Sequence, residues 1–415
     1  LFIFILITYT ISEVSKELEN INFKIVEPKS QLESYQQAMK MLIVFGQSLG
    51  LNPVQGILES NVTNIRFKVL SWRFLHCILI GIGQTVALVL CLYRLLSNSI
   101  SIGALGFFSF YASTCVTTFL FIQIGYKWSK LMKDIAKCSL DEYIDKRTKN
   151  KCYILTVTNI SLGLIEHVLS LLHKIEHIVS CDPDASIYDE YLKDQFPWYF
   201  ELNVSRNVPV GILLQILNVT STLNWNYLDL YIVCTSIYLA GLLNKINEKI
   251  VSASEKHYLP SSHWRVLRED YTRATRLVRS FDDVISSLVF TSFASNLFFI
   301  CLQVFNILVI FNGYEYSVYL VFSTTLLLAR ALTVSLVAAS VNTASLVPSP
   351  ALYSVPSSAF SDEVSRFITQ VNEDKIALSG LQFFYVTRDL VLTVSTTTYV
   401  LLVKLTGRQI FLKIV

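Results

Sequence analysis

A stripe of polar side chains interrupts an apolar stretch near residues 152–175. Glu166, Ser170, His173 and His177 are spaced by four, three and four residues, which places them on one face of an α-helix. An ionised carboxylate in a membrane is expensive, so it should face protein or water and have a partner. The stripe predicts either one wall of a water-accessible ligand pocket or a buried structural pair of Glu166 with a basic side chain.

His167 lies next to this carboxylate, and we include it with Glu166, Ser170 and His173 among the predicted ligand-binding residues. No further His or Cys occurs at a matching depth, so we expect no bound metal. Nothing in the sequence indicates a cofactor.

A second polar group lies within the apolar stretch 208–242, where Trp225, Asn226 and Asp229 follow one another. Planar hydrogen-bonding groups suit a polar ligand, and an indole supplies an apolar face. We predict that these residues bind ligand and that Trp198, in the preceding loop, caps the pocket. The alternative is that the polar side chains only hold helices together.

Arg330 lies midway along the apolar stretch 316–343 and must be paired there. Its candidate partners are Asp229 and Glu166, and we favour a structural role for this arginine over ligand contact. Arg388 lies near the start of the last apolar stretch, where it is expected to anchor the helix rather than to meet ions.

The elements that must position these residues are membrane helices. Hydrophobic residues make up 53% of the 415-residue chain and charged residues 16%, against about 25% in a soluble domain. The net charge of +3 is small and does not indicate a nucleic-acid partner, whereas lipid is an expected one. We predict an all-α protein with seven membrane-spanning helices. These spans lie near 70–96, 102–126, 152–175, 208–242, 284–311, 316–343 and 379–404.

The loop charges predict the orientation. The loops at 127–151 and 244–281 each carry eight Lys/Arg, whereas 174–207 carries three Lys/Arg and seven Asp/Glu. Positively charged loops stay in the cytoplasm, so the N-terminus should be cytoplasmic and the C-terminus extracellular. This is the reverse of a G-protein-coupled receptor.

The expected organisation follows from these spans. It consists of a cytosolic N-terminal segment (1–69), a six-helix ligand-binding bundle (70–343) with cytosolic extensions (127–151 and 244–283) and an extracellular loop (176–207), a cytosolic linker with an amphipathic anchor helix (344–378), a seventh helix (379–405) and an extracellular tail (406–415).

Three segments resemble the insect gustatory receptor family, most closely its sugar-receptor branch. They are "FGQSLGLNPVQGI" (45–57), "LNWNYLDLYIVCTSIYLA" (223–240) and "FFYVTRDLVLTVSTTTYVLLVKL" (383–405), and the resemblance covers nearly the whole chain. It implies a homotetramer, or a heterotetramer with related receptors, around one central pore lined by the seventh helix. The implied activity is a non-selective cation channel that an extracellular sugar opens in the plasma membrane of gustatory sensory neurons.

The resemblance also assigns roles in the seventh helix. Arg388 and Tyr399 match family motif positions, and the stripe Ser395, Thr398, Leu402 and Leu405 corresponds to the pore face. Leu402 and Leu405 would form the constriction, where an apolar ring closes a pore by dewetting. Without the resemblance, the same stripe could pack on another helix.

The end of this motif departs from the family pattern. Leu405 occupies the position of a polar glutamine, and Lys404 precedes it. A ring of lysines near a cation pore would oppose cation flow unless it faces away or lies in the outer vestibule.

Three other functions are alternatives to a sugar-gated channel. One is an odorant-receptor-type channel for a non-sugar ligand, and the density of polar residues in the outer bundle disfavours it. Another is a secondary transporter with Glu166, Asp229 and Arg330 as a coupling relay, although the sequence shows no inverted repeat. A membrane enzyme with His167 or His173 as base lacks a second catalytic motif, so we expect no enzyme.

Overall fold

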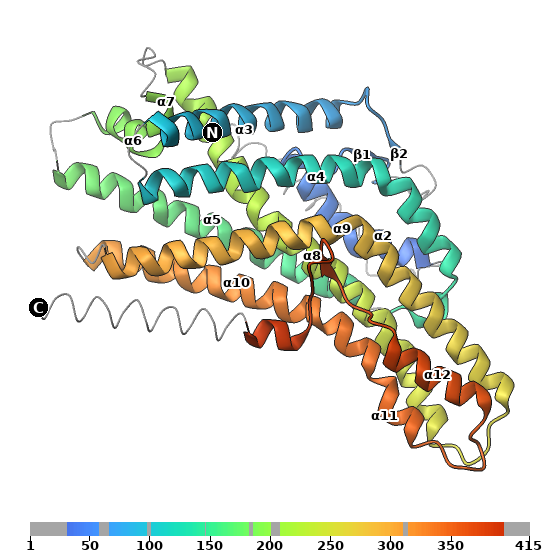
Figure 1. Ribbon diagram of the computed structural model, residues 1–415. Helices are drawn as coiled ribbons and strands as arrows, with labels where there is room; N and C mark the ends of the chain where they lie inside the picture. Colours follow the sequence, from blue (N-terminus) through green and yellow to red (C-terminus); the bar gives the residue numbers. More distant parts are fainter. Residues whose placement is uncertain are drawn as a thin grey trace, which may run out of the picture.

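The computed structural model describes residues 31–57, 66–97, 101–145, 147–181, 186–200, 208–309 and 314–393. Long helices dominate these residues and lie side by side in a bundle that narrows toward the end formed by α11 and α12 (Figure 1). The helices are α2 (Gln31–Ser48), α3 (Trp72–Ser97), α4 (Ile102–Cys138), η2 (Asp141–Tyr143), α5 (Thr148–Cys181), α6 (Ile187–Gln195), α7 (Pro197–Phe200), α8 (Val208–Ser254), α9 (Ser261–Val309), α10 (Tyr314–Leu346), α11 (Pro348–Tyr353) and α12 (Asp362–Glu373).

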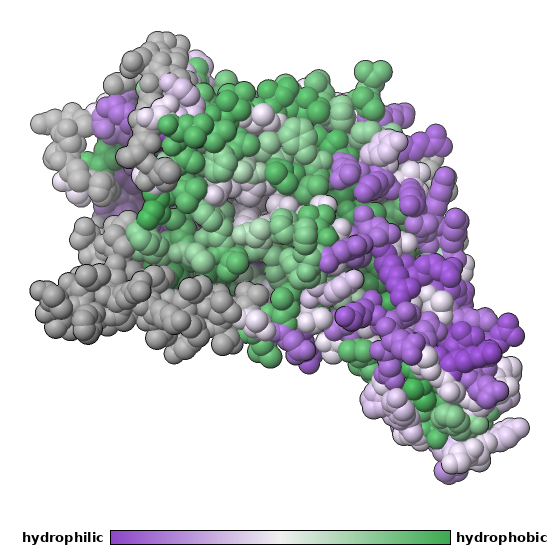
Figure 2. All heavy atoms as spheres, viewed as in Figure 1, coloured by the Kyte–Doolittle hydropathy of each residue, from purple (hydrophilic) through white to green (hydrophobic). Residues whose placement is uncertain are grey.

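Within the described residues, six helices are long and apolar enough to cross a membrane: α3, α4, α5, α8, α9 and α10. They coincide with the first six predicted spans, so the all-α, multi-pass prediction is confirmed for this part of the chain. Hydrophobic residues cover much of the visible outer face of the bundle, and hydrophilic ones gather toward the narrow end (Figure 2). The chain is therefore built for a lipid environment on its flanks.

α8 is the central helix. In its most apolar window 89% of the residues are buried, against 11–39% in the other five spans. Tyr227, Tyr231 and Cys234 lie in its interior face, and α10, α9, α5 and α4 all pack around it. The expected N-terminal segment contributes to the same core, because Tyr35 and Met39 of α2 are fully buried.

α9 continues as one helix far beyond its membrane span. At 1.5 Å per residue its 49 residues extend over about 70 Å, more than twice the hydrocarbon thickness. The expected continuation over 264–283 is confirmed, and its apolar stripe, including Trp264 and Tyr271, is buried. Arg268 Nε donates to Glu363 Oε2 of α12 at 3.0 Å, which holds the pKa of that carboxyl below its usual range.

The seventh helix begins later than the sequence predicted. Ser379–Gly380 (β3) pairs antiparallel with Phe384–Tyr385 (β4), and helical residues start only at Arg388. The turn places Leu381 and Gln382 at positive φ, which a helix does not allow. The predicted start at 379 is therefore wrong. A second short hairpin joins β1 (Val54–Gln55) to β2 (Arg66–Phe67).

The remaining predictions for the seventh helix fall outside the described residues. Those positions are Ser395, Thr398, Tyr399, Leu402 and Leu405.

Candidate ligand-binding site

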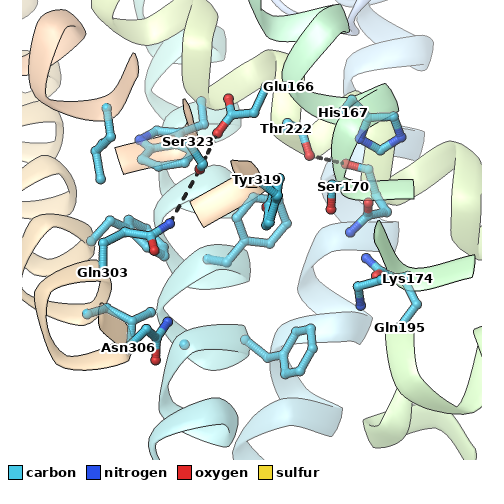
Figure 3. A pocket seen from close by; sticks show the side chains of 18 of the residues that line it. Glu166, His167, Ser170, Lys174, Gln195, Thr222, Gln303, Asn306, Tyr319 and Ser323 are labelled. Carbon is cyan, nitrogen blue, oxygen red and sulfur yellow. Dashed lines mark hydrogen bonds between the residues drawn. The ribbon is translucent and has the colours of Figure 1, made fainter. Parts of the chain in front are cut away.

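A cavity of about 370 Å³ lies among α4, α5, α6, α8, α9 and α10, within the size range of small-molecule sites (Figure 3). Its polar lining comes from five of these helices and its apolar lining mainly from α4 and α9. The polar residues are Glu166, His167, Ser170, Lys174, Tyr191, Gln195, Asn218, Thr222, Gln303, Asn306, Tyr319, Ser323 and Arg330. The apolar ones include Phe107, Phe110, Trp225, Phe299, Leu302 and Leu327.

Glu166 accepts a hydrogen bond from a neutral side chain on another helix. Ser323 Oγ on α10 donates to Glu166 Oε1 at 2.6 Å, and Gln303 Nε2 on α9 donates to Ser323 Oγ at 3.4 Å (Figure 3). Among the described residues no Lys or Arg forms an ion pair with this carboxylate. The arrangement favours the pocket-wall interpretation over a buried ion pair, because the carboxylate keeps acceptor capacity on the cavity side.

The outer part of the cavity is tied to α6. Gln215 Nε2 lies 3.5 Å from His167 Nε2, and Tyr191 OH donates to Gln215 Oε1 at 2.9 Å. Lys174 Nζ lies 2.7 Å from Asp194 Oδ2, a second link between α5 and α6. The segment predicted to form the extracellular loop thus contributes a short helix, α6, to the cavity wall.

The deep end of the cavity is formed by an aromatic pair and a guanidinium. The rings of Trp225 and Phe299 have centroids 4.6 Å apart, and Arg330 Cζ lies 3.9 Å from the Trp225 ring centroid. A cation over an indole face is attracted by the ring quadrupole. One face of Trp225, expected to serve a ligand, is therefore occupied by Arg330.

Arg330 is paired with Asp229, one of its two predicted partners. Its Nε lies 2.9 Å from Asp229 Oδ2, and Arg330 also donates to Asn226 Oδ1. Ser292 Oγ donates to Asp229 Oδ1, and Asn296 Nδ2 lies 3.1 Å from Asp229 Oδ2. All five residues of this network are buried, and they come from α8, α9 and α10. The network therefore links these three helices directly behind the cavity.

Of the eight predicted ligand-binding residues, four line the cavity: Glu166, His167, Ser170 and Trp225. The other four lie elsewhere. Asn226 and Asp229 belong to the network behind Arg330, and His173 stacks on Tyr319 with ring centroids 5.7 Å apart. Trp198 is buried in a separate apolar cluster against Tyr111, at 5.4 Å.

Several lining residues were not predicted, although their spacing along the sequence places them on one face of a helix. Tyr319, Ser323, Leu327 and Arg330 of α10 are separated by four, four and three residues. On α8, Asn218 and Thr222 precede the predicted Trp225 by seven and three residues, and Phe299, Gln303 and Asn306 of α9 show the same kind of interval. Residues at intervals of three or four lie on one face of an α-helix, as in the stripe that contains Glu166.

Two lining side chains outside the Asp229–Arg330 ion pair carry unsatisfied polar atoms. Trp225 Nε1, a donor, and Gln303 Oε1, an acceptor, are buried without a hydrogen-bond partner among the described residues. Buried polar groups are normally hydrogen-bonded, so both atoms are suited to a polar ligand. In the described part of the chain, no cluster of three His, Cys, Asp or Glu could hold a metal ion.

The fold and cavity define a class of multi-pass membrane protein with a small-molecule cavity inside its helical bundle. Solved structures of the insect olfactory receptor OR5 from Machilis hrabei share this fold. The first has a TM-score of 0.65 at 14% identity, and covers 88% of this chain and 97% of that one. The complex of the same receptor with eugenol has a TM-score of 0.67 at 14% identity, over 89% and 97% of the two chains.

Sequence comparison identifies the family. The family model described as "Trehalose receptor" matches residues 13–407. The Drosophila melanogaster gustatory receptor for sugar taste 64f is 30% identical over 374 residues, 88% of this chain and 78% of that protein. The Drosophila melanogaster gustatory receptor 5a for trehalose is 28% identical over 88% and 83% of the two chains. The chain belongs to this family of insect gustatory receptors. It is a chemoreceptor and not an enzyme, as the resemblance implied.

Proposed function

We propose that the protein is a sugar-gated, non-selective cation channel in the plasma membrane of gustatory sensory neurons. Membership of the family supports a chemoreceptor, and relatives are named for sugar taste and for trehalose. Four subunits, identical or related, would surround one pore.

The observation that carries the sugar assignment is the chemistry of the 370 Å³ cavity. A sugar presents many hydroxyls on a ring whose C–H faces are apolar. Glu166 and Gln303 Oε1 can accept from hydroxyls, and Trp225 Nε1 can donate to one. Because Arg330 covers one face of Trp225 and His173 stacks on Tyr319, the side chain of Phe110 is better placed to meet ring C–H groups.

The gate would respond through α9. This helix lines the cavity with Phe299 and Gln303, and nearer its cytosolic end it holds the β3–β4 hairpin that leads into the seventh helix. The rings of Phe293 and Phe384 lie 5.4 Å apart across this junction. A sugar that binds a contracted cavity more tightly would shift the population toward a displaced α9 and an open pore.

The proposed pore face consists of Ser395, Thr398, Leu402 and Leu405, with Tyr399 and Arg388 as motif positions and the two leucines as the constriction. Lys404 would then face away from the conduction path or lie in the outer vestibule, because a lysine ring opposes cations.

The experiment is patch recording of the expressed receptor against a panel of sugars. Sugar-evoked current should be lost, with surface expression intact, in Glu166→Gln, since the neutral amide is a weaker acceptor for Ser323 and ligand hydroxyls. Glu255→Gln, at an exposed position beyond α8, is the matched control and should respond as the parent does. A normal sugar response in Glu166→Gln would contradict the site.

A second candidate is an odorant-type channel for an apolar ligand, which the shared fold of the eugenol-bound receptor favours. Adding eugenol to the same panel separates the two. A eugenol-evoked current without any sugar response would replace the sugar assignment, and uptake current without unitary events would indicate a transporter instead.

A further inference from the structure

A second cavity, of about 840 Å³, lies toward the opposite ends of α5, α8 and α10. On α5 the first cavity is lined by residues between 166 and 174. The second is lined by Ile144, Asp145, Arg147 and Lys151, just before and at the start of that helix. Ile237, Leu336 and Val337 form an apolar wall, and Arg147, Lys151 and Lys245 supply three cationic side chains. The proposed sugar-gated function makes no use of this cavity.

The surroundings of this cavity correspond to the edge of the hydrocarbon layer. Ile154 on α5 is 62% exposed and Leu336 on α10 is 53% exposed, so apolar surface flanks the opening. One turn before Ile154, charged residues take over and continue into the basic 127–151 segment. Basic side chains that follow an apolar belt meet the phosphates of lipid headgroups.

The cationic side chains that line the cavity are available to bind an anion. Lys151 Nζ lies 3.3 Å from Asp145 Oδ2, and Lys245 Nζ lies 2.7 Å from Glu248 Oε2. Both lysine side chains are partly exposed, at 53% and 39%, so solvent screens their ion pairs and a phosphate can compete with the carboxylates. Arg147 forms no ion pair with any described residue, and it precedes the N-terminus of the 34-residue α5. A helix N-terminus adds partial positive charge.

We propose that this cavity binds one anionic phospholipid of the adjoining leaflet. The headgroup phosphates lie against Arg147, Lys151 and Lys245, and an acyl chain follows the wall of Ile237, Leu336 and Val337 into the bilayer. A soluble phosphate would match the cations but would leave the apolar wall uncovered. A neutral lipid would match the wall but not Arg147.

The test is lipid binding to the full-length receptor, purified and placed in nanodiscs. Phosphatidylcholine discs are compared with discs that also contain phosphatidylinositol bisphosphate, and bound lipid is quantified by mass spectrometry after repurification. We expect the parent to retain the bisphosphate lipid selectively. Arg147→Gln should weaken retention about five-fold, and Arg147→Gln with Lys151→Gln and Lys245→Gln roughly 100-fold.

Lys149→Gln is the matched control, because it removes the same charge two residues from Lys151 outside the cavity lining. It should retain the lipid, and its size-exclusion profile should equal that of the parent. If the triple variant aggregates, the comparison of lipid retention between Arg147→Gln and Lys149→Gln is sufficient to test the site. Equal losses in these two would overturn the site. So would parent-like retention in Arg147→Gln, or soluble inositol trisphosphate that binds as tightly as the lipid.

Discussion

Asp229 and Arg330 are the most deeply placed charged residues behind the ligand cavity, at 1% and 8% exposure. Their charges satisfy each other, and Ser292, Asn226 and Asn296 satisfy much of the remaining hydrogen-bonding capacity. Removing one member strands a buried charge, which costs more than the pair contributes. Asp229 was predicted to touch ligand. In the structure it positions Arg330, which lines the cavity.

At this scale we predict that Asp229→Ala destabilises the protein by about 3–5 kcal/mol. The change leaves the Arg330 guanidinium buried without its carboxylate. The measurement is the thermal midpoint of the detergent-solubilised receptor, followed by fluorescence-detected size exclusion.

The double variant Asp229→Leu with Arg330→Met replaces both charges by apolar groups and should recover much of that loss. A parent-like midpoint in Asp229→Ala, together with a lost sugar response, would instead mean that Asp229 contacts ligand.

At the scale of elements, α9 joins the cavity to the hairpin before the seventh helix. Asp282 Oδ1 accepts from the Ser379 backbone N–H at 2.6 Å, and Asp282 Oδ2 accepts from Ser379 Oγ at 2.7 Å. Two charge-assisted bonds to one residue fix the hairpin on α9. These bonds connect α9 directly to the hairpin that leads into the proposed pore helix.

We predict that Asp282→Asn uncouples binding from opening. An amide cannot accept both bonds equally well, and a hydrogen bond to a charged group contributes about 1.5–3 kcal/mol. The sugar concentration for half-maximal current should rise by roughly ten-fold or more, while equilibrium sugar binding stays near the parental value. Current and radiolabelled-sugar binding are measured on the same preparation.

The neighbouring Asp283→Asn, at an exposed position, is the control and should leave both quantities unchanged. An equal loss of binding and of current in Asp282→Asn would show that this residue maintains the cavity rather than the coupling.

At the scale of the whole molecule, the other five spans of the described chain pack around the buried α8, and the flanks expose apolar side chains. A further helix follows the hairpin at Arg388. We predict that purified particles are tetramers with fourfold symmetry and with the seventh helices at the axis. Class averages from electron microscopy of the receptor in detergent measure this. Monomers that nevertheless give sugar-evoked currents after reconstitution would contradict the shared pore.

The sequence by itself determined the features that depend on the spacing of residues along one helix and on the free energy of transferring side chains from water into the membrane. The six described spans, the continuation of α9, the polar stripe at Glu166 and the need of Arg330 for an acidic partner all follow from spacing, hydropathy and the cost of burying a charge. Each of these statements concerns one helix and its environment. None of them requires knowledge of how two helices cross.

Only the tertiary structure decided which polar residues share the cavity. Helix rotation and crossing set whether Asp229 meets a ligand or Arg330, and one sequence stripe is compatible with both. The same holds for Ser323, which bonds to Glu166, and for Ser379, which bonds to Asp282 nearly one hundred residues away. Contacts between distant segments are fixed by the packing of the whole bundle, which no single helix encodes.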